Sequence, residues 1–294
     1  MAGMAKRPLA WATAVILISG AAASCSSGEG SNRNRNSALP TTTLGEGETS
    51  VPSDSTLAPD NSSPTDSIPE GTTSQEALVQ TGAASGDEFG GAVTVSADGT
   101  TLAVAAMRHK EEQGAVTVFV KDNGKWMEQQ VLSDAEGAAK DWFGYSMAIS
   151  ANGSTLAISS VYSDVDGKKD AGSVSVYSRD NGKWTLSKKL TATSVSAGDI
   201  FGVSVSLSTD GRTLAVGASG ADAGAANSGA VTVFAAENNS WTAQGVLSPK
   251  KPVANGNFGA SVSLSMNGDT LAVGGPSGGT GQAFVFSRAN GTWS

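Results

Sequence analysis

The strongest constraint on the fold of this chain is an internal repeat that covers residues 75–294. Each repeat opens with a Phe-Gly pair, and successive pairs are separated by 54, 58 and 57 residues. The four pairs are Phe89-Gly90, Phe143-Gly144, Phe201-Gly202 and Phe258-Gly259. Such a chain is expected to form the same supersecondary unit four times. Each unit must bury its apolar faces against the neighbouring repeats.

The order of features within a repeat predicts four antiparallel strands. In the third repeat, an alternating run over 203–208 leads to Asp210-Gly211, and then to Leu214-Ala215-Val216. A variable loop, the run 231–234 and a second polar turn follow, before Trp241. Asp-Gly or Asn-Gly between alternating runs is a strong hairpin signal, because both residues of a two-residue turn need positive φ. Four such strands per repeat predict the blades of a β-propeller, an all-β fold.

The pattern FG…S-x-D-G-x-T-L-A-V-G-A…G-A-V-x-V-F…W resembles the FG-GAP repeat, best known from the propeller of integrin α-subunits and common in bacterial surface proteins. The resemblance extends over residues 75–294, with blades that begin near residues 89, 143, 201 and 258. Two departures matter. The calcium loop that this family often carries between the first two strands is replaced by a two-residue turn, and integrin propellers have more blades than four.

The two ends of the repeat region predict how the ring closes. Leu78 precedes Phe89 by eleven residues, as Leu132, Leu190 and Leu247 precede the Phe of their own repeats, whereas the fourth repeat stops at Trp293-Ser294. We therefore expect residues 75–79 to complete the last blade as a strand beside 282–287, which would leave no exposed edge. The alternative is an open array that a second chain completes.

The N-terminal segment 1–24 reads as a secretory signal peptide. Lys6 and Arg7 precede an apolar run over 9–23, which is shorter than a membrane span of about 20 residues. The segment 21–25 resembles a bacterial lipobox, although Ala22 stands where Leu is commonest. The resemblance implies that Cys25, the single cysteine, carries a diacylglycerol with fatty acyl chains such as palmitate. An ordinary signal peptide cut nearby is the alternative.

Residues 25–74 are predicted to form a disordered tether behind the lipidated cysteine. Ser, Thr, Gly, Asn and Pro dominate this stretch, and it contains no aromatic residue. Such a composition cannot bury enough apolar surface to offset the entropy lost on ordering. The tether would hold the repeat domain of 75–294 away from a membrane.

Residues suited to catalysis are scarce, so we expect a protein that is not an enzyme and needs no cofactor. His109 is the single histidine, and it lies in a charged loop where a solvated surface position is the simplest interpretation. The one candidate metal loop holds Asp164, Asp166 and Asp170, because Ca²⁺ prefers several oxygens on a tight bend. Two lysines in that loop favour a solvated acidic loop instead.

Long, variable loops predict where a ligand would bind. In a four-stranded meander, the loops between the second and third strands lie at the same end of the sheet as the blade-to-blade connections, and recognition usually resides in such loops. The candidate binding residues there are Trp142, Tyr162, Arg108 and His109. Trp142, which precedes Phe143, could equally cover a blade edge.

These features together favour a binding or adhesion module on the cell surface, attached to the membrane by its lipid and directed at a protein or glycan. The net charge of −8 argues against a nucleic-acid partner, and a closed ring would be a monomer. A periplasm-facing scaffold of an envelope complex is the alternative with the same anchor. A propeller hydrolase that uses clustered carboxylates is a third.

Overall fold

The computed structural model describes residues 76–238, 240–277 and 279–294. The chain divides into two units, Met1–Glu70 and Gly71–Ser294, and the described residues belong to the second. The expected signal peptide (1–24), the lipidated Cys25, the tether (25–74) and Gln75 lie outside the described residues. No helix among the described residues is both long enough and apolar enough to cross a membrane.

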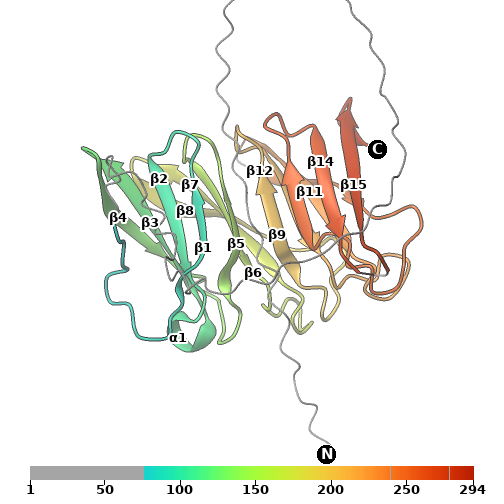
Figure 1. Cartoon of the computed structure of the whole chain (residues 1–294), viewed down its shortest axis with the longest axis horizontal. Coiled ribbons are helices and arrows are strands. Elements are labelled where there is room, and N and C mark those ends of the chain that lie inside the picture. Colours follow the sequence, from blue (N-terminus) through green and yellow to red (C-terminus); the bar gives the residue numbers. More distant parts are fainter. Residues whose placement is uncertain (1–75, 239, 278) are drawn as a thin grey trace, which may run out of the picture. The chain divides into compact units, whose positions relative to one another are not determined.

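Four antiparallel sheets of four strands each confirm the predicted all-β fold, with the strands of each sheet in chain order. We call the sheets blades 1 to 4 (Figure 1). Blade 1 contains β1 (Phe89–Val95), β2 (Thr101–Ala106), β3 (Ala115–Asp122) and β4 (Lys125–Leu132). Blade 2 contains β5 (Phe143–Ile149), β6 (Thr155–Ser160), β7 (Ser173–Asp180) and β8 (Lys183–Leu190).

The second half of the domain repeats this arrangement. Blade 3 contains β9 (Phe201–Leu207), β10 (Thr213–Ala218), β11 (Ala230–Glu237) and β12 (Ser240–Leu247). Blade 4 contains β13 (Ser261–Leu264), β14 (Thr270–Gly275), β15 (Gln282–Ala289) and β16 (Thr292–Trp293). A short turn, α1 (His109–Glu112), in which Lys110, Glu111 and Glu112 have positive φ, interrupts the connection between β2 and β3.

The expectation of two-residue turns after the first strands is wrong. In blade 1 the connection runs from Ser96 to Thr100, and only Gly99 has a positive φ, of 67°. The Asp98 side chain closes the turn, because its Oδ1 accepts hydrogen bonds from the hydroxyl of Ser96 and the amide of Thr100. The two-residue turn with both φ values positive lies instead between β3 and β4, at Asn123 (47°) and Gly124 (81°).

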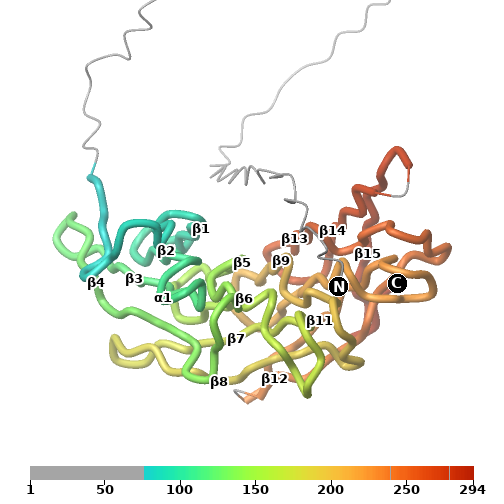
Figure 2. The backbone as a smooth tube through the Cα atoms, turned by 90° about the horizontal axis from the view of Figure 1, so that it is seen from below, coloured from blue at the N-terminus to red at the C-terminus, as the bar shows by residue number. Residues whose placement is uncertain are grey.

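Apolar faces pack each blade on the next. The first strands β1, β5, β9 and β13 pack against one another in that order, so neighbouring blades lie side by side (Figure 2). At the first junction, the core combines Ala103, Val116 and Val118 of blade 1 with Phe143 and Ile158 of blade 2. We call the surface that a blade turns to the next blade its trailing face, and the surface that it turns to the preceding blade its leading face.

Glycines allow the backbones of neighbouring blades to approach closely. Gly172 of blade 2 has a φ of +83°, and a Cβ at this position would overlap the carbonyl oxygen of Phe201 in blade 3. Gly114 and Gly229 stand in the same relation to Phe143 and Phe258. The glycine before β3, β7 and β11 is therefore required by packing between blades as well as by backbone conformation.

Closure by the N-terminal segment is not found. Residues 76–80 form no strand, and the amide of Thr81 donates a hydrogen bond of 2.9 Å to Glu128 Oε2 in β4 of blade 1. The last strand β16 pairs with Arg288 and Ala289 of β15. Among the described residues, blade 4 packs on blade 3 and has no comparable packing on blade 1. The expected strand fails because the residue that follows it closely, Thr81, is held at blade 1, at the opposite end from blade 4 (Figures 1 and 2).

Candidate functional site

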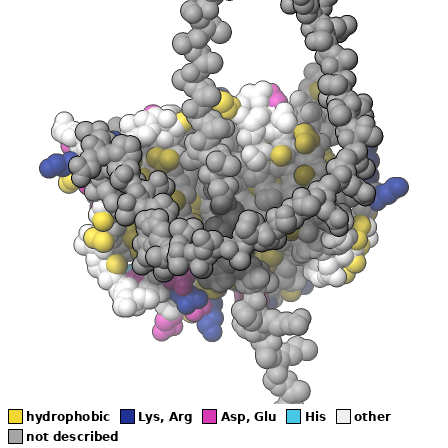
Figure 3. Space-filling model, in the orientation of Figure 1, with side chains coloured by type: hydrophobic (Ala, Val, Ile, Leu, Met, Phe, Trp, Pro, Cys, Tyr) yellow, Lys and Arg dark blue, Asp and Glu magenta, His cyan; other side chains and the backbone are white. Residues whose placement is uncertain are grey.

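The long connections gather at one end of the blades, as the sequence predicts. The β2–β3 connection of blade 1, which contains α1, lies at this end (Figure 1). Acidic and basic side chains collect there, around the position of α1 (Figure 3). We call this side the loop end, and the opposite side, with the short β1–β2 and β3–β4 turns, the turn end.

An aromatic cluster lies at the loop end of the junction between blades 1 and 2. The ring of Trp142 stacks on Tyr145 with centroids 6.1 Å apart and meets Tyr162 edge-on at 5.2 Å. All three residues are partly buried. The structure thus brings the predicted Trp142 and Tyr162 together and adds Tyr145. A comparison of repeats could have identified Tyr145, because Gly91, Val203 and Ala260 follow the other Phe-Gly pairs.

Backbone contacts fix the position of the central indole. Trp142 adopts a φ of 56°, rare for a large side chain, and its amide donates a hydrogen bond to the carbonyl of Glu112. Its indole Nε1 donates a second hydrogen bond of 3.1 Å to Glu112 Oε2. The amide of Tyr162 donates to the carbonyl of Asp141. Trp142 is therefore held against blade 1.

The two phenols of the cluster remain neutral at physiological pH. Burial raises the pKa of Tyr145 above its ordinary value. Burial also raises the pKa of Tyr162, with smaller contributions from Tyr145 and the carboxylate of Asp170. Both phenols can therefore donate hydrogen bonds, so the cluster offers ring surfaces beside hydroxyl groups and the carboxylate of Glu112.

Arg108 and His109 form pairs with carboxylates of blade 1. The Arg108 Nε lies 3.2 Å from Glu88 Oε1, and His109 Nδ1 lies 2.8 Å from Asp87 Oδ2. The side chain of His109 is 18% exposed, so the expected solvated position is wrong. The hydrogen bond from His109 is the main cause of a lowered pKa at Asp87. Arg108 and His109 thus connect the β2–β3 loop to the loop that precedes β1.

The aspartate that precedes three of the Phe-Gly pairs caps a loop, as its recurrence suggests. Oδ2 of Asp87, Asp141 and Asp199 accepts a hydrogen bond of 2.7–2.9 Å from the amide three residues earlier. Desolvation by burial is the main cause of the raised pKa of Asp141 and Asp199. These carboxylates are structural elements of the blade-to-blade connections.

The candidate calcium loop does not assemble a metal site. The Asp164 Oδ1 accepts a hydrogen bond of 2.9 Å from the amide of Asp170, and Val165 pairs with Lys168 in a short bridge. In the part of the chain that the structure describes, no three His, Cys, Asp or Glu side chains gather as metal ligands. The loop folds around its own backbone, so Asp164, Asp166 and Asp170 do not converge.

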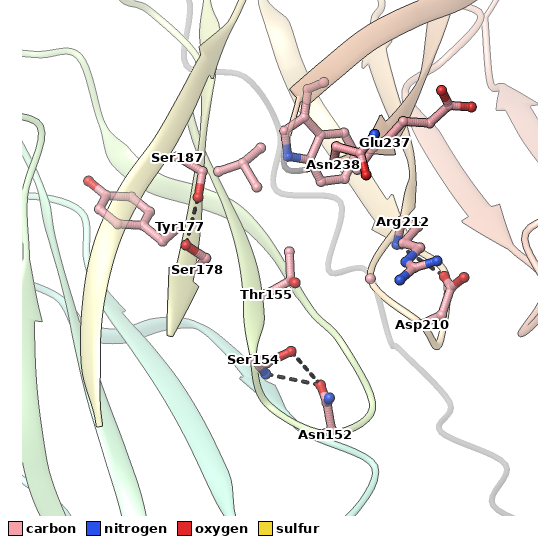
Figure 4. Close-up of a pocket in the computed structure, with 14 residues that line it drawn as sticks. Asn152, Ser154, Thr155, Tyr177, Ser178, Ser187, Asp210, Arg212, Glu237 and Asn238 are labelled. Atoms are coloured by element: carbon pink, nitrogen blue, oxygen red, sulfur yellow. Dashed lines mark hydrogen bonds between the residues drawn. The ribbon is translucent and has the colours of Figure 1, made fainter. Parts of the chain in front are cut away.

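A groove at the turn end, between blades 2 and 3, is a feature that the sequence interpretation missed. Its volume is about 600 Å³, within the range of small-ligand sites. Asn152 and Ser154 lie on one side of it and Asp210 and Arg212 on the other, with Glu237 near its rim (Figure 4). Such a mixture of amide, hydroxyl, carboxylate and guanidinium groups suits a polar ligand.

The groove is open because blade 3 lacks an arginine that blades 2 and 4 carry. Arg179 of blade 2 crosses to the hydroxyl of Thr101 in blade 1, and Arg288 of blade 4 crosses to Thr213 in blade 3. Each guanidinium also lies over a tryptophan of its own blade, Trp184 or Trp293. Blade 3 has Ala236 at the equivalent position. A methyl group cannot span the junction, so the space beside Thr155 and Trp241 stays unfilled.

Comparison with known proteins supports the repeat assignment in the middle of the domain. The family described as FG-GAP repeat matches residues 126–177 and 184–234. No curated protein matches the chain.

Two solved structures align with part of the chain. A structure provisionally assigned as a 6-phosphogluconolactonase from Bacteroides uniformis aligns with a TM-score of 0.46 and 16% identity, over 69% of this chain and 52% of that one. Hydrazine synthase of Kuenenia stuttgartiensis aligns with a TM-score of 0.46 and 19% identity, over 73% and 51% of the two chains. The chain thus spans about half the length of these two structures.

Proposed function

We propose that this chain is a binding or adhesion module that faces the outside of the cell membrane and recognises a protein or glycan at its loop end. The observation that carries the proposal is the cluster of Trp142, Tyr145 and Tyr162. Three partly buried rings on a rigid scaffold provide a large contact area at low entropic cost, as in known binding hot spots.

The chemistry of the cluster supports either class of ligand. The ring faces can pack on the C–H surface of a sugar or on an apolar or cationic side chain, while the phenols and Glu112 can form hydrogen bonds. The long loops around the cluster differ among the repeats, which favours recognition of one particular partner. The turn-end groove beside Arg212 is a second candidate site for the same function, favoured by its volume.

Delivery to the membrane surface forms the second part of the proposal. The basic and apolar N-terminal residues, with Cys25 at the end of a lipobox-like segment, support export and lipid attachment. Two acyl chains would make such an anchor stable without help from the protein. Catalysis is not part of the proposal.

A binding screen followed by paired substitutions tests the ligand site. The purified chain would be screened against immobilised glycans and matrix proteins, and each hit measured with Trp142→Ala, Tyr162→Ala and Arg212→Ala. We expect Trp142→Ala to weaken binding at least about tenfold, as for a hot-spot aromatic. Leu186→Ala is the control, because Leu186 is 53% exposed on the outer strand β8.

The outcomes separate the two sites. Loss of binding in Trp142→Ala and Tyr162→Ala alone supports the loop end, and loss in Arg212→Ala alone moves the site to the groove. Unchanged binding in all three would refute both sites.

Localisation has its own test. Protease treatment of intact cells should release a fragment of the domain, whereas release only after envelope disruption would favour the periplasm-facing scaffold. The Cys25→Ser variant should fail to incorporate labelled fatty acid, and unchanged incorporation would reject the anchor.

A further inference from the structure

Blade 1 leaves part of its leading face open to solvent. Val93 in β1 is 58% exposed, whereas the equivalent residues of blades 2 and 3, Met147 and Val205, are each 9% exposed. Val95, two residues further along β1, is 38% exposed. Phe119, farther out on the same face, is buried and packs edge-on against Phe89. The open area is therefore the inner part of the face, along β1.

Blade 4 leaves its trailing face open. Val285 in β15 is 69% exposed, whereas the equivalent Val118, Val176 and Val233 are at most 1% exposed. Ala272 and Ala283 on the same face are also exposed. In blades 1 to 3, the next blade covers these positions. Blade 4 therefore carries the same kind of apolar interface residues on a face that is exposed.

The two open faces correspond to the two halves of the interface that joins neighbouring blades. At each of the three internal junctions, a trailing face of small and β-branched residues receives a leading face that begins with the Phe of a Phe-Gly pair. A backbone hydrogen bond fixes the register each time. The bonds are Phe143 N–H to Gln113 O (2.9 Å), Phe201 N–H to Ala171 O (2.8 Å) and Phe258 N–H to Ser228 O (3.0 Å).

We propose that a second copy of this chain covers these faces, with the leading face of blade 1 of one copy packed on the trailing face of blade 4 of the other. Continuing the register would place the Phe89 amide of one copy against the Thr280 carbonyl of its partner. The occupant is a second copy because the surface that fits the trailing face of blade 4 is a leading face, and blade 1 presents a free one.

Symmetry sets the size of the assembly. A head-to-tail interface closes into a ring when its rotation returns to the start. Propellers typically contain roughly four to eight blades. Two copies of a four-blade chain reach the upper end of that range, and a third copy would exceed it. The proposal is thus a two-fold symmetric ring of two chains, and it replaces the expected closed monomer.

The connections at the turn end follow the same logic. The Ala151 amide in blade 2 donates to Thr209 O in blade 3, and the Thr209 amide donates to Met266 O in blade 4. Met266 is therefore the last residue of a series that runs from blade to blade, and its side chain is 78% exposed. In the proposed ring, this series continues into blade 1 of the second copy.

The test is a complementation experiment with the full chain in mild detergent, with Cys25→Ser in every variant so that no disulfide can join copies. Light scattering should give the mass of two chains for the parent. Val93→Glu and Val285→Glu should each shift the mass towards one chain. Both side chains are largely exposed, so circular dichroism and thermal unfolding should remain unchanged. Leu186→Glu, on the outer strand of blade 2, is the control and should stay dimeric.

Mixing the two variants distinguishes head-to-tail pairing from other modes. Val93→Glu retains a normal blade 4 face and Val285→Glu retains a normal blade 1 face, so an equal mixture should regain dimers through one intact interface. Recovery of dimers supports the proposal. A monomeric parent at about 100 μM, well above ordinary dissociation constants, would overturn it. A dimer that persists in Val285→Glu would also overturn it, and this result is expected if the copies associate through the apolar N-terminal run instead. So would a mixture of the two variants that remains monomeric.

Discussion

Arg179 of blade 2 donates a hydrogen bond of 2.9 Å from Nη1 to the hydroxyl oxygen of Thr101 in blade 1. Thr101 is fully buried, and the same guanidinium lies 5.9 Å from the centre of the Trp184 ring. One side chain therefore joins two blades and covers an aromatic residue of the blade core. The equivalent residue is Arg288 in blade 4, which also crosses its junction, and Ala236 in blade 3, where the groove remains open.

Arg179→Ala should lower the free energy of unfolding by about 1–2 kcal/mol, because it removes a charge-assisted hydrogen bond and leaves the Thr101 hydroxyl buried without this partner. Urea unfolding followed by tryptophan fluorescence measures the effect. Lys188→Ala, an exposed change on β8, is the control and should stay within about 0.5 kcal/mol of the parent. Equal stabilities for the two variants would contradict the role given to Arg179.

Ala236→Arg should rebuild the missing bridge between blades 2 and 3. The new guanidinium would reach the Thr155 hydroxyl and cover Trp241, and one hydrogen bond of this kind contributes about 1 kcal/mol. We expect a higher unfolding midpoint, a filled groove in a crystal structure and weaker binding of any groove ligand. Ala236→Gln, which cannot stack a guanidinium, is the matched control. A lower midpoint for Ala236→Arg would show that Arg212 already occupies the space.

Gly172→Ala should destabilise the domain far more than Gly167→Ala. Both glycines have positive φ, 83° and 71°, so both variants incur a backbone cost of about 1 kcal/mol. Only at Gly172 does the new Cβ overlap the backbone of Phe201, whereas nothing lies within 4 Å of a Cβ at Gly167. We expect an additional loss of at least about 1–3 kcal/mol in chemical denaturation. Similar losses would mean that the junction between blades 2 and 3 adjusts freely.

The pKa values of the capping aspartates should be shifted in opposite directions, with opposite effects on the pH dependence of stability. Because the His109 hydrogen bond lowers the folded-state pKa of Asp87, this carboxyl stabilises the fold above its unfolded pKa of about 4. That contribution is lost as the pH falls through the lower, folded-state pKa. Asp141 and Asp199 have raised folded-state pKa values, so stability falls as the pH rises from the unfolded pKa through the folded one.

NMR titration of the carboxyl carbons tests this difference directly. Asp87 should titrate below 3.8 and Asp141 and Asp199 above it. His109→Gln should move the pKa of Asp87 upwards and leave that of Asp199, two blades away, unchanged. A pKa of Asp87 that does not respond would contradict the assigned cause.

Local features of the sequence were sufficient to predict the strands, their order and the end at which the loops gather. The reason is that Phe-Gly, Leu-Ala followed by Val or Ile, and Trp recur at equivalent positions, so each prediction was made four times from independent segments. The turn after β1 was misread, because Asp98 replaces a second positive φ with side-chain hydrogen bonds that composition alone does not reveal.

The candidate sites depended on contacts between repeats, which a single repeat does not specify. Trp142 and Tyr162 could be predicted as large residues in variable loops, but their approach to Tyr145 follows from the way blade 2 packs on blade 1. The groove was missed because it arises from Ala236, an unremarkable residue until its equivalents Arg179 and Arg288 are seen to cross their junctions.

The sequence by itself determined the repeating unit, because hairpin turns and strand alternation are local properties that each segment of about 55 residues carries in full. Only the tertiary structure decided how the four units end. The spacing of Leu78 from Phe89 was compatible with a closed ring, yet Thr81 is held at Glu128 in blade 1, and Val285 remains exposed on blade 4. Closure depends on the rotation accumulated from blade to blade, a geometric property of packed faces that the spacing of residues along the chain does not encode.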